Sequence, residues 1–215
     1  MKHIAFKTVS LIVLTLFVAS TAAAIDGREV AEHVENRDDG ETGHSLVNMD
    51  LIDEGGNTRS RIIEEWSMET EDDLSRLVIV FHRPASVEGT RFLVAENEDR
   101  DDDQWIYLPS LDRVRRIAGS EGGESFMGTD FTYDDLKTRD VDEDRHELLR
   151  EEEFGGRECY VVESIPKDPD DSQYSKRVQW VAKDIWIPMK IELYDKSEDL
   201  LKINTVDFLD RVDLQ

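Results

Sequence analysis

Cysteine is nearly absent from this sequence: Cys159 is the only one among its 215 residues. A single cysteine cannot form a disulfide bond within the chain, so the folded state must be stabilised by its apolar core. Cys159 is followed directly by an apolar stretch at residues 160–162. We therefore expect a small buried side chain at this position rather than a reactive thiol.

Long hydrophobic runs are also missing after the first two dozen residues. Residues 1–24 combine two lysines with an apolar stretch at residues 9–19 and a small-residue cleavage site, which is typical of a signal peptide. The apolar stretch is too short to cross about 30 Å of hydrocarbon, although a signal anchor is an alternative. We predict a signal peptide cleaved near Ala24, a single mature domain at residues 25–215, and a periplasmic location. The residue after the cleavage site is Ile25, not the cysteine that carries a lipoprotein's lipid.

Positive charge is scarce as well. The chain has 26 Lys and Arg residues against 50 Asp and Glu residues, which gives a net charge of −24. A chain with this charge repels nucleic acid and anionic membrane surfaces unless it carries a local basic patch. We therefore expect no nucleic-acid partner and no stable membrane insertion.

Motifs for catalysis and metal binding are not found. Residues 123–127 (GESFM) place Met127 where the nucleophile motif G-x-S-x-G requires glycine. The histidines lack the ligand spacing of H-E-x-x-H. The acidic run at residues 96–103 lacks the glycine and glutamate of a calcium loop, so we expect a solvated hairpin tip there. These observations predict no catalytic residue, no metal and no cofactor, with an enzyme built from dispersed residues as a less favoured alternative.

Short segments in which apolar and polar residues alternate, such as residues 47–51, dominate the rest of the chain. Ten or eleven such strands joined by tight turns predict one large antiparallel sheet. A sheet with that many strands tends to curl or close on itself. Helices are expected only at residues 133–136 and at residues 26–40, where Asp26 and Glu29 can form a capping box.

Residues 105–136 carry the most informative pattern. An aromatic strand and an arginine-rich strand precede a glycine-rich crossing at residues 119–123, and the turn FMGTDF follows at residues 126–131. This order resembles the signature of the outer membrane lipoprotein-sorting proteins, a branch of the LolA/LolB-like carrier superfamily. The run WIPMKIELYD at residues 186–195 resembles that family's closing hairpin, and the likeness covers roughly residues 26–213.

The resemblance implies a mainly β (α+β) domain: a single curved, half-open antiparallel β-barrel-like sheet with short helices that plug a hydrophobic cleft. It further implies a non-enzymatic periplasmic carrier or chaperone that binds lipid or lipoprotein acyl chains, with an RND-type inner-membrane exporter as a possible partner. The candidate lipid-binding residues are Trp66, Phe81, Phe92, Trp105, Tyr107, Phe126, Met127 and Phe131. We expect Trp66 and Trp105 to lie on neighbouring strands and to face the cleft together.

Three arginines are candidates for contact with an anion or a partner. On an extended backbone Arg113 and Arg115 point to one side and Arg116 to the other. Guanidinium groups bind phosphates and carboxylates through a planar pair of donors. The alternative is that these arginines pair with the abundant carboxylates on neighbouring strands.

Residues 119–136 are predicted to form a mobile flap over the cleft. Three glycines loosen its first part, and Phe126, Met127 and Phe131 supply an apolar face for the pocket that a lipid would fill. The alternative is an ordered loop that is packed for stability. A sensor or adaptor that binds a protein partner is the alternative function for the same fold.

Overall fold

The computed structural model describes residues 24–37, 40–72 and 74–206. The predicted signal peptide lies outside the described residues, apart from Ala24. Within those three ranges, no helix has the length and apolar character needed to cross a membrane.

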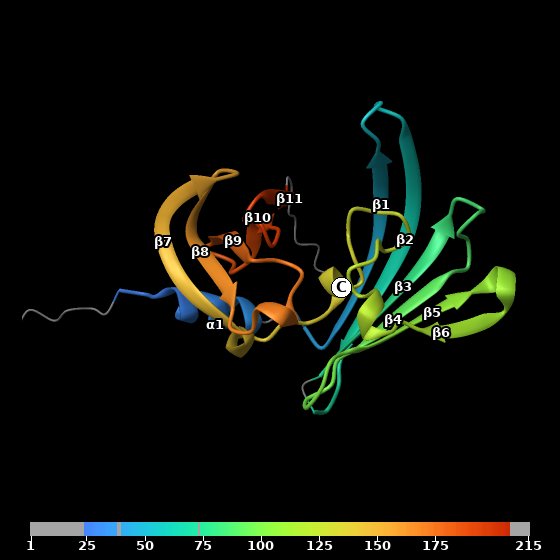
Figure 1. Ribbon diagram of the computed structural model, residues 1–215, viewed down its shortest axis with the longest axis horizontal. Helices are drawn as coiled ribbons and strands as arrows, with labels where there is room; N and C mark the ends of the chain where they lie inside the picture. Colours follow the sequence, from blue (N-terminus) through green and yellow to red (C-terminus); the bar gives the residue numbers. More distant parts are fainter. Residues whose placement is uncertain (1–23, 38–39, 73, 207–215) are drawn as a thin grey trace, which may run out of the picture.

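The first half of the domain is a six-stranded antiparallel sheet, the N-terminal sheet, in which the strands lie in the order of the sequence (Figure 1). Its strands are β1 (Thr42–Ile52), β2 (Thr58–Glu69), β3 (Ser75–Arg83), β4 (Arg91–Ala95), β5 (Asp103–Leu108) and β6 (Arg113–Arg116). The short 3-10 helix η1 (Pro109–Leu111) joins β5 to β6. Sequential hairpins of this kind need only tight turns, as in the β1–β2 turn, where the Asp53 carboxylate accepts backbone N–H bonds from Gly55 and Asn57.

The second half is a five-stranded antiparallel sheet, the C-terminal sheet. Its strands are β7 (Asp144–Phe154), β8 (Arg157–Pro166), β9 (Lys176–Ala182), β10 (Pro188–Tyr194) and β11 (Leu200–Thr205). They are again paired in sequence order, from β7 at one edge to β11 at the other. The 3-10 helix η5 (Pro169–Asp171) lies between β8 and β9.

The two sheets are joined by residues 117–143, which lie between them in Figure 1. This connection contains the 3-10 helices η2 (Gly119–Glu121), η3 (Asp134–Leu136) and η4 (Val141–Glu143). The predicted mainly β fold class is therefore confirmed, but the strands form two sheets where one continuous sheet was predicted. The reason is that the connection packs its apolar side chains on the first sheet instead of extending the strand pairing.

The helix α1 (Gly27–Glu35) covers one face of the C-terminal sheet. The predicted capping box is present, since the Asp26 carboxylate accepts the Glu29 N–H and the Glu29 carboxylate accepts the Asp26 N–H. Val30 is fully buried and packs against Val162 of β8 and Val181 of β9. A Cβ on Gly27 would lie 2.6 Å from the Glu147 carbonyl carbon, so only glycine permits this close approach to β7.

Cys159 is fully buried and lies in the cluster on the other face of the C-terminal sheet. Its neighbours in that cluster include Val161, Val178, Trp180 and Met189. Burial raises the pKa of the Cys159 thiol above its ordinary value. The prediction of a small, buried and unreactive side chain is consistent with this environment.

Candidate functional site: a plugged sheet face

One face of the N-terminal sheet is covered by residues 119–136, which we call the plug. Phe126 of the plug is 2% exposed, and its ring centre lies 4.9 Å from that of Phe92 and 5.9 Å from that of Phe81. Tyr133 of the plug lies 5.8 Å from Phe126 and 5.7 Å from Phe92. The covered side of the sheet, here called the plugged face, also contributes Ile63, Ile79, Val94 and Ile106. The plug therefore adds two aromatic side chains, Phe126 and Tyr133, to a core that it forms together with side chains of the sheet.

The tip of the plug is a tight turn at residues 126–131. The Phe126 N–H donates to the Phe131 carbonyl at 2.7 Å, and the Thr129 N–H donates to the Phe126 carbonyl at 3.0 Å. Met127 and Gly128 have φ angles of 52° and 73°. The left-handed conformation costs roughly 1–2 kcal/mol for a residue with a side chain, so Met127 is strained in this turn.

Two buried polar side chains of the sheet hold the backbone of the plug. Arg61 Nη2 on β2 donates to the Met127 carbonyl at 2.5 Å, and Gln104 Nε2 on β5 donates to the Tyr133 carbonyl at 2.7 Å. Each of the two side chains is left with one buried atom that has no hydrogen-bond partner, Arg61 Nη1 and Gln104 Oε1. Leaving a buried polar atom unpaired costs about 1–3 kcal/mol, so this contact is incompletely satisfied.

The opposite side of the plug is bound to the C-terminal half of the domain by charged and polar groups. Asp135 accepts a hydrogen bond from Tyr174 Oη at 2.6 Å and one from Lys202 Nζ at 2.8 Å. Gln173 Nε2 donates to Thr132 Oγ1 at 2.5 Å. Burial opposes the ionisation of Asp135, but its bonds from Lys202 and Tyr174 outweigh that penalty and hold its pKa below the ordinary value.

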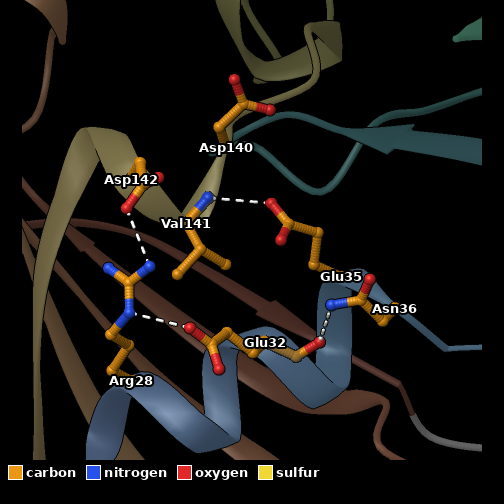
Figure 2. Close-up of a pocket in the computed structure, with 7 residues that line it drawn as sticks. All are labelled: Arg28, Glu32, Glu35, Asn36, Asp140, Val141 and Asp142. Carbon is orange, nitrogen blue, oxygen red and sulfur yellow. Dashed lines mark hydrogen bonds and ion pairs between the residues drawn. The ribbon is translucent and has the colours of Figure 1, made fainter.

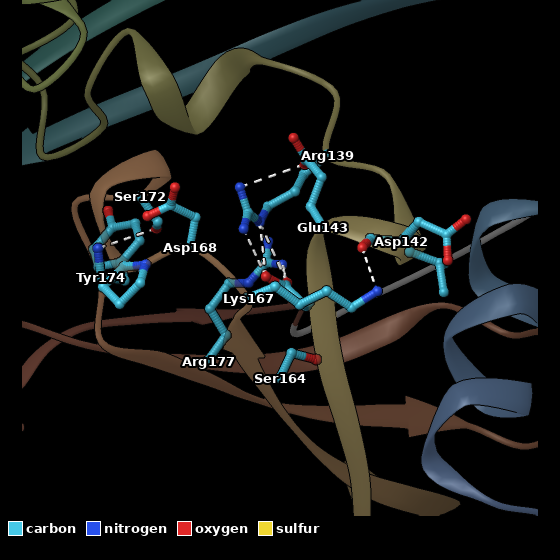
Figure 3. Close-up of polar contacts among 12 residues, drawn as sticks. Arg139, Asp142, Glu143, Ser164, Lys167, Asp168, Ser172, Tyr174 and Arg177 are labelled. Carbon is cyan, nitrogen blue, oxygen red and sulfur yellow. Dashed lines mark hydrogen bonds and ion pairs between the residues drawn. The ribbon is translucent and has the colours of Figure 1, made fainter.

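A second buried ion cluster lies at the start of β7. The Asp144 carboxylate is fully buried and accepts bonds from Arg139 Nε at 3.1 Å and Arg139 Nη2 at 2.6 Å, and it also pairs with Arg177 of β9. In Figure 3 the side chain of Arg139, from the connection, and that of Arg177, from β9, point toward each other. Burial alone would raise the pKa of Asp144. The bonds and charges of the two guanidinium groups outweigh this effect, so the pKa of Asp144 lies below its ordinary value.

The cleft between the two sheets is polar. It has two adjoining parts of about 750 Å³ and 920 Å³, which share Glu96, Thr138, Arg139, Arg177 and Gln179 among their lining residues. A smaller crevice of about 430 Å³ lies between α1 and residues 140–142 (Figure 2). The expected hydrophobic cleft is therefore not open: the apolar surface is under the plug, and the open space is lined largely by charged and amide groups.

Four of the eight predicted lipid-binding residues come together at the plugged face. Phe81 and Phe92 are fully buried there, Phe126 packs against both, and Met127 is partly buried against the same cluster. Phe131 is 38% exposed and lines the polar cleft between the sheets instead.

The other three predicted cleft residues lie on the opposite, outer face of the N-terminal sheet. The register pairs Ile63 with Phe81 and places Trp66 three residues further along β2, so Trp66 faces away from the plug. Trp105 and Tyr107 likewise alternate with the buried Ile106. Trp66 is 49% exposed. The prediction that Trp66 and Trp105 lie on neighbouring strands and face the cleft is wrong, since β3 and β4 separate them.

The three predicted arginines do not converge on one site. The register places Arg115 opposite Ile106 and Arg116 opposite Trp105, so they point to different faces as expected. Arg115 pairs with Glu121 of the plug at 2.5 Å, and Arg116 pairs with Asp103. Arg113 is exposed. Pairing with nearby carboxylates, the alternative considered from the sequence, accounts for Arg115 and Arg116.

Sequence reasoning missed the polar residues that hold the plug, above all Arg61, Gln104, Asp135 and Lys202. A signal was present for Arg61: it stands two residues before Ile63, at a position that strand alternation assigns to the buried face. Asp135 and Lys202 are far apart in sequence, and no local pattern indicates that they form an ion pair.

Comparisons with known proteins agree with this architecture. A protein-family model described as "Uncharacterized protein" matches residues 73–214. The structure is similar to an outer membrane lipoprotein-sorting protein domain from Vibrio parahaemolyticus, with 36% identity, a TM-score of 0.76, and coverage of 83% of this chain and 76% of that one. It is also similar to a DUF1329 family protein from Desulfovibrio piger, with 37% identity, a TM-score of 0.76, and coverage of 82% and 75%.

A more distant structural relative is a LolA superfamily protein from Nitrosomonas europaea. It shares 20% identity and a TM-score of 0.64, with coverage of 88% of this chain and 80% of that one, which shows a common fold. The curated proteins give no match. Two structures above one third identity over four fifths of the chain settle the assignment, and the chain belongs to the LolA-like family of outer membrane lipoprotein-sorting proteins.

Proposed function

We propose that this protein is a periplasmic carrier that binds the acyl chains of lipid or lipoprotein cargo on the plugged face. The observation that carries this proposal is that a connecting segment, and not the second sheet, supplies the side chains that cover the apolar face. The turn at residues 126–131 of this segment takes no part in the strand pairing of either sheet, so it can leave that face while both sheets stay intact. An RND-type inner-membrane exporter is the proposed partner that loads or receives the cargo.

The free energy gained by burying the plug side chains is close to that gained by burying an acyl chain on the same face. Burying Phe126, Met127 and Tyr133 contributes about 2 kcal/mol for each side chain. An acyl chain that buries about eight methylenes on the same face gains roughly 6 kcal/mol at 0.8 kcal/mol for each methylene. The strained turn at Met127 and the incompletely satisfied Arg61 and Gln104 lower the cost of moving the plug. A near balance suits a carrier, because it must release what it binds.

Lipid mass spectrometry of the purified protein, followed by titration with a labelled fatty acid, tests this proposal. We expect stoichiometric lipid in the wild type and tighter binding in Phe126→Ala, because that variant removes a side chain that competes with the cargo. Val181→Ala is the matched control, since Val181 is equally buried but lies under α1 on the other sheet. A protein that is free of lipid and does not bind the fatty acid in either variant would refute the carrier.

The alternative function, an adaptor that binds a protein partner, is favoured by a different surface. Three large apolar side chains on the outer face of the N-terminal sheet are 49–65% exposed: Leu46, Trp66 and Val114. If Trp66→Ser abolishes the function of the protein in cells while its lipid binding is unchanged, the outer face has a function of its own. If the same variant leaves activity intact, the carrier function needs only the plugged face.

A further inference from the structure

Arg61 is a buried cation that has no counter-ion among the residues that the structure describes. Its residue is 8% exposed, and its guanidinium lies 5.8 Å from the centre of the Phe81 ring. Among the residues that the structure describes, its only hydrogen-bond acceptor is the Met127 carbonyl, and Nη1 has none. Burial and the charge of Arg59 both lower its pKa, and no carboxylate within the described ranges opposes them.

This arrangement is unusual because carboxylates are abundant in this protein. Asp and Glu outnumber Lys and Arg by 50 to 26. The other buried charges follow the usual rule: Asp144 lies against Arg139 and Arg177, and Asp135 lies against Lys202. An uncompensated buried charge costs several kcal/mol, which a methionine or leucine on β2 would avoid. The guanidinium therefore points to a ligand that supplies the missing negative charge.

We propose that Arg61 binds the anionic group of the cargo, a carboxylate or a phosphate attached to an acyl chain. This inference rests on the proposed carrier function and names the class of cargo. When the 126–131 turn moves, the Met127 carbonyl leaves Arg61, and both arms of the guanidinium become available to two oxygens of one anion. A planar pair of N–H donors matches a carboxylate or phosphate in this bidentate geometry.

The surroundings of Arg61 fit an amphiphile with a charged end. Along the plugged face, Arg61 is followed on β2 by Ile63, which lies opposite Phe81 on β3, and the next row contains Ile79 and Phe92. The neighbour two residues before Arg61 is the exposed Arg59, at the end of β2 that adjoins the β1–β2 turn. The anion would therefore lie at the edge of the apolar surface, with the acyl chain running across it toward β4 and β5.

The test compares three ligands that share one twelve-carbon chain: dodecanoate, dodecyl phosphate and the neutral dodecanol. Two charge-assisted hydrogen bonds lead us to expect that the wild type binds at least one anion about ten to a hundred times more tightly than the alcohol. A preference for dodecanoate would identify the anionic group of the cargo as a fatty-acid carboxylate. A preference for dodecyl phosphate would identify it as a lipid phosphate. Arg61→Met should lose this preference and still bind dodecanol, and Arg61→Lys should keep part of it.

Arg59→Met is the matched control, because it removes one exposed positive charge from the same strand and should keep the preference. Thermal unfolding of Arg61→Met checks its fold, which should persist because methionine removes a buried charge without emptying the site. Equal affinity for anions and alcohol in the wild type, or an unchanged preference in Arg61→Met, would overturn the proposal for Arg61. Absence of binding by all three ligands would instead contradict the carrier function itself.

Discussion

The plug is held by two contacts of opposite character. Against the N-terminal sheet it buries aromatic rings, chiefly Phe126 and Tyr133, and its backbone is held by single bonds from Arg61 and Gln104. Against the C-terminal sheet it is held through Asp135 by an ion pair and a tyrosine hydroxyl.

Because the two contacts differ in character, different conditions can break the contact of the plug with each sheet. Apolar contacts respond to a competing hydrocarbon and very little to pH. Ion pairs respond to protonation of their carboxylates and not to hydrocarbon. The plug can therefore exchange with an acyl chain on one side while the other side keeps it attached to the domain.

The largest effect is expected on the apolar side. Phe126→Ala should lower the free energy of unfolding by about 3–5 kcal/mol, because it removes a buried aromatic ring and leaves a cavity. Phe131→Ala removes the same side chain from a position that is 38% exposed and should cost far less. Urea unfolding of both variants measures the difference, and equal losses would show that Phe126 does not hold the plug on the sheet.

On the charged side, Asp135→Asn should cost about 3 kcal/mol, because it leaves the Lys202 ammonium partly buried without its partner. Asp134→Asn is the matched control: Asp134 pairs with Lys137 at 2.6 Å in a more exposed position, where such pairs contribute at most about 1 kcal/mol. Chemical unfolding of the two variants separates these cases. If both variants lose the same small amount, the Asp135 contact contributes no more than a surface pair.

Asp135 and Asp144 should both contribute to the pH dependence of stability. Both have a folded-state pKa below the ordinary value, so their stabilisation is complete above the unfolded pKa of about 3.9. It is lost as the pH falls through their folded values. Stability should therefore be insensitive to these groups near neutrality and decline in the acid range below about pH 4. Unfolding curves of the wild type and Asp135→Asn should converge there, and a constant gap between them would refute the assignment.

The smallest effect should come from the outer face. Trp66→Phe should change stability by less than about 1 kcal/mol, because Trp66 is 49% exposed and its ring stacks on His44 at 3.8 Å. Tryptophan emission should also stay nearly constant when a fatty acid binds, since Trp66 and Trp105 face away from the plug. A large emission change in the wild type that disappears in Trp66→Phe would place the lipid on the outer face.

The sequence predicted the elements better than their arrangement. Alternation of apolar and polar residues located most strands, and Asp26 with Glu29 located the start of α1. Alternation also separates the two faces of a strand, but it does not say which face is covered. Trp66 and Phe81 were therefore assigned to the same cleft although they lie on opposite sides of the sheet.

The division into two sheets and the polar contacts of the plug could not be predicted. Strand pairing ends at Arg116, and the residues that follow pack Phe126 and Tyr133 on the face of the sheet. Where the pairing ends therefore depends on tertiary packing. The Asp135–Lys202 pair joins the connection between the sheets to β11, 67 residues further along the chain. Local patterns contain no information about such contacts, whereas Arg61 could have been noticed as a charge at a buried strand position.

Hydrogen exchange at the amides of the plug tests whether cargo and plug occupy the same face of the N-terminal sheet. The amides of Phe126, Thr129, Tyr133 and Asp134 each donate a hydrogen bond within the plug. With a saturating fatty acid, we predict that these amides lose protection while those of β2, β3 and β4 keep theirs. Fatty acid that binds stoichiometrically and leaves the plug amides as protected as the central strands would show that cargo does not displace the plug.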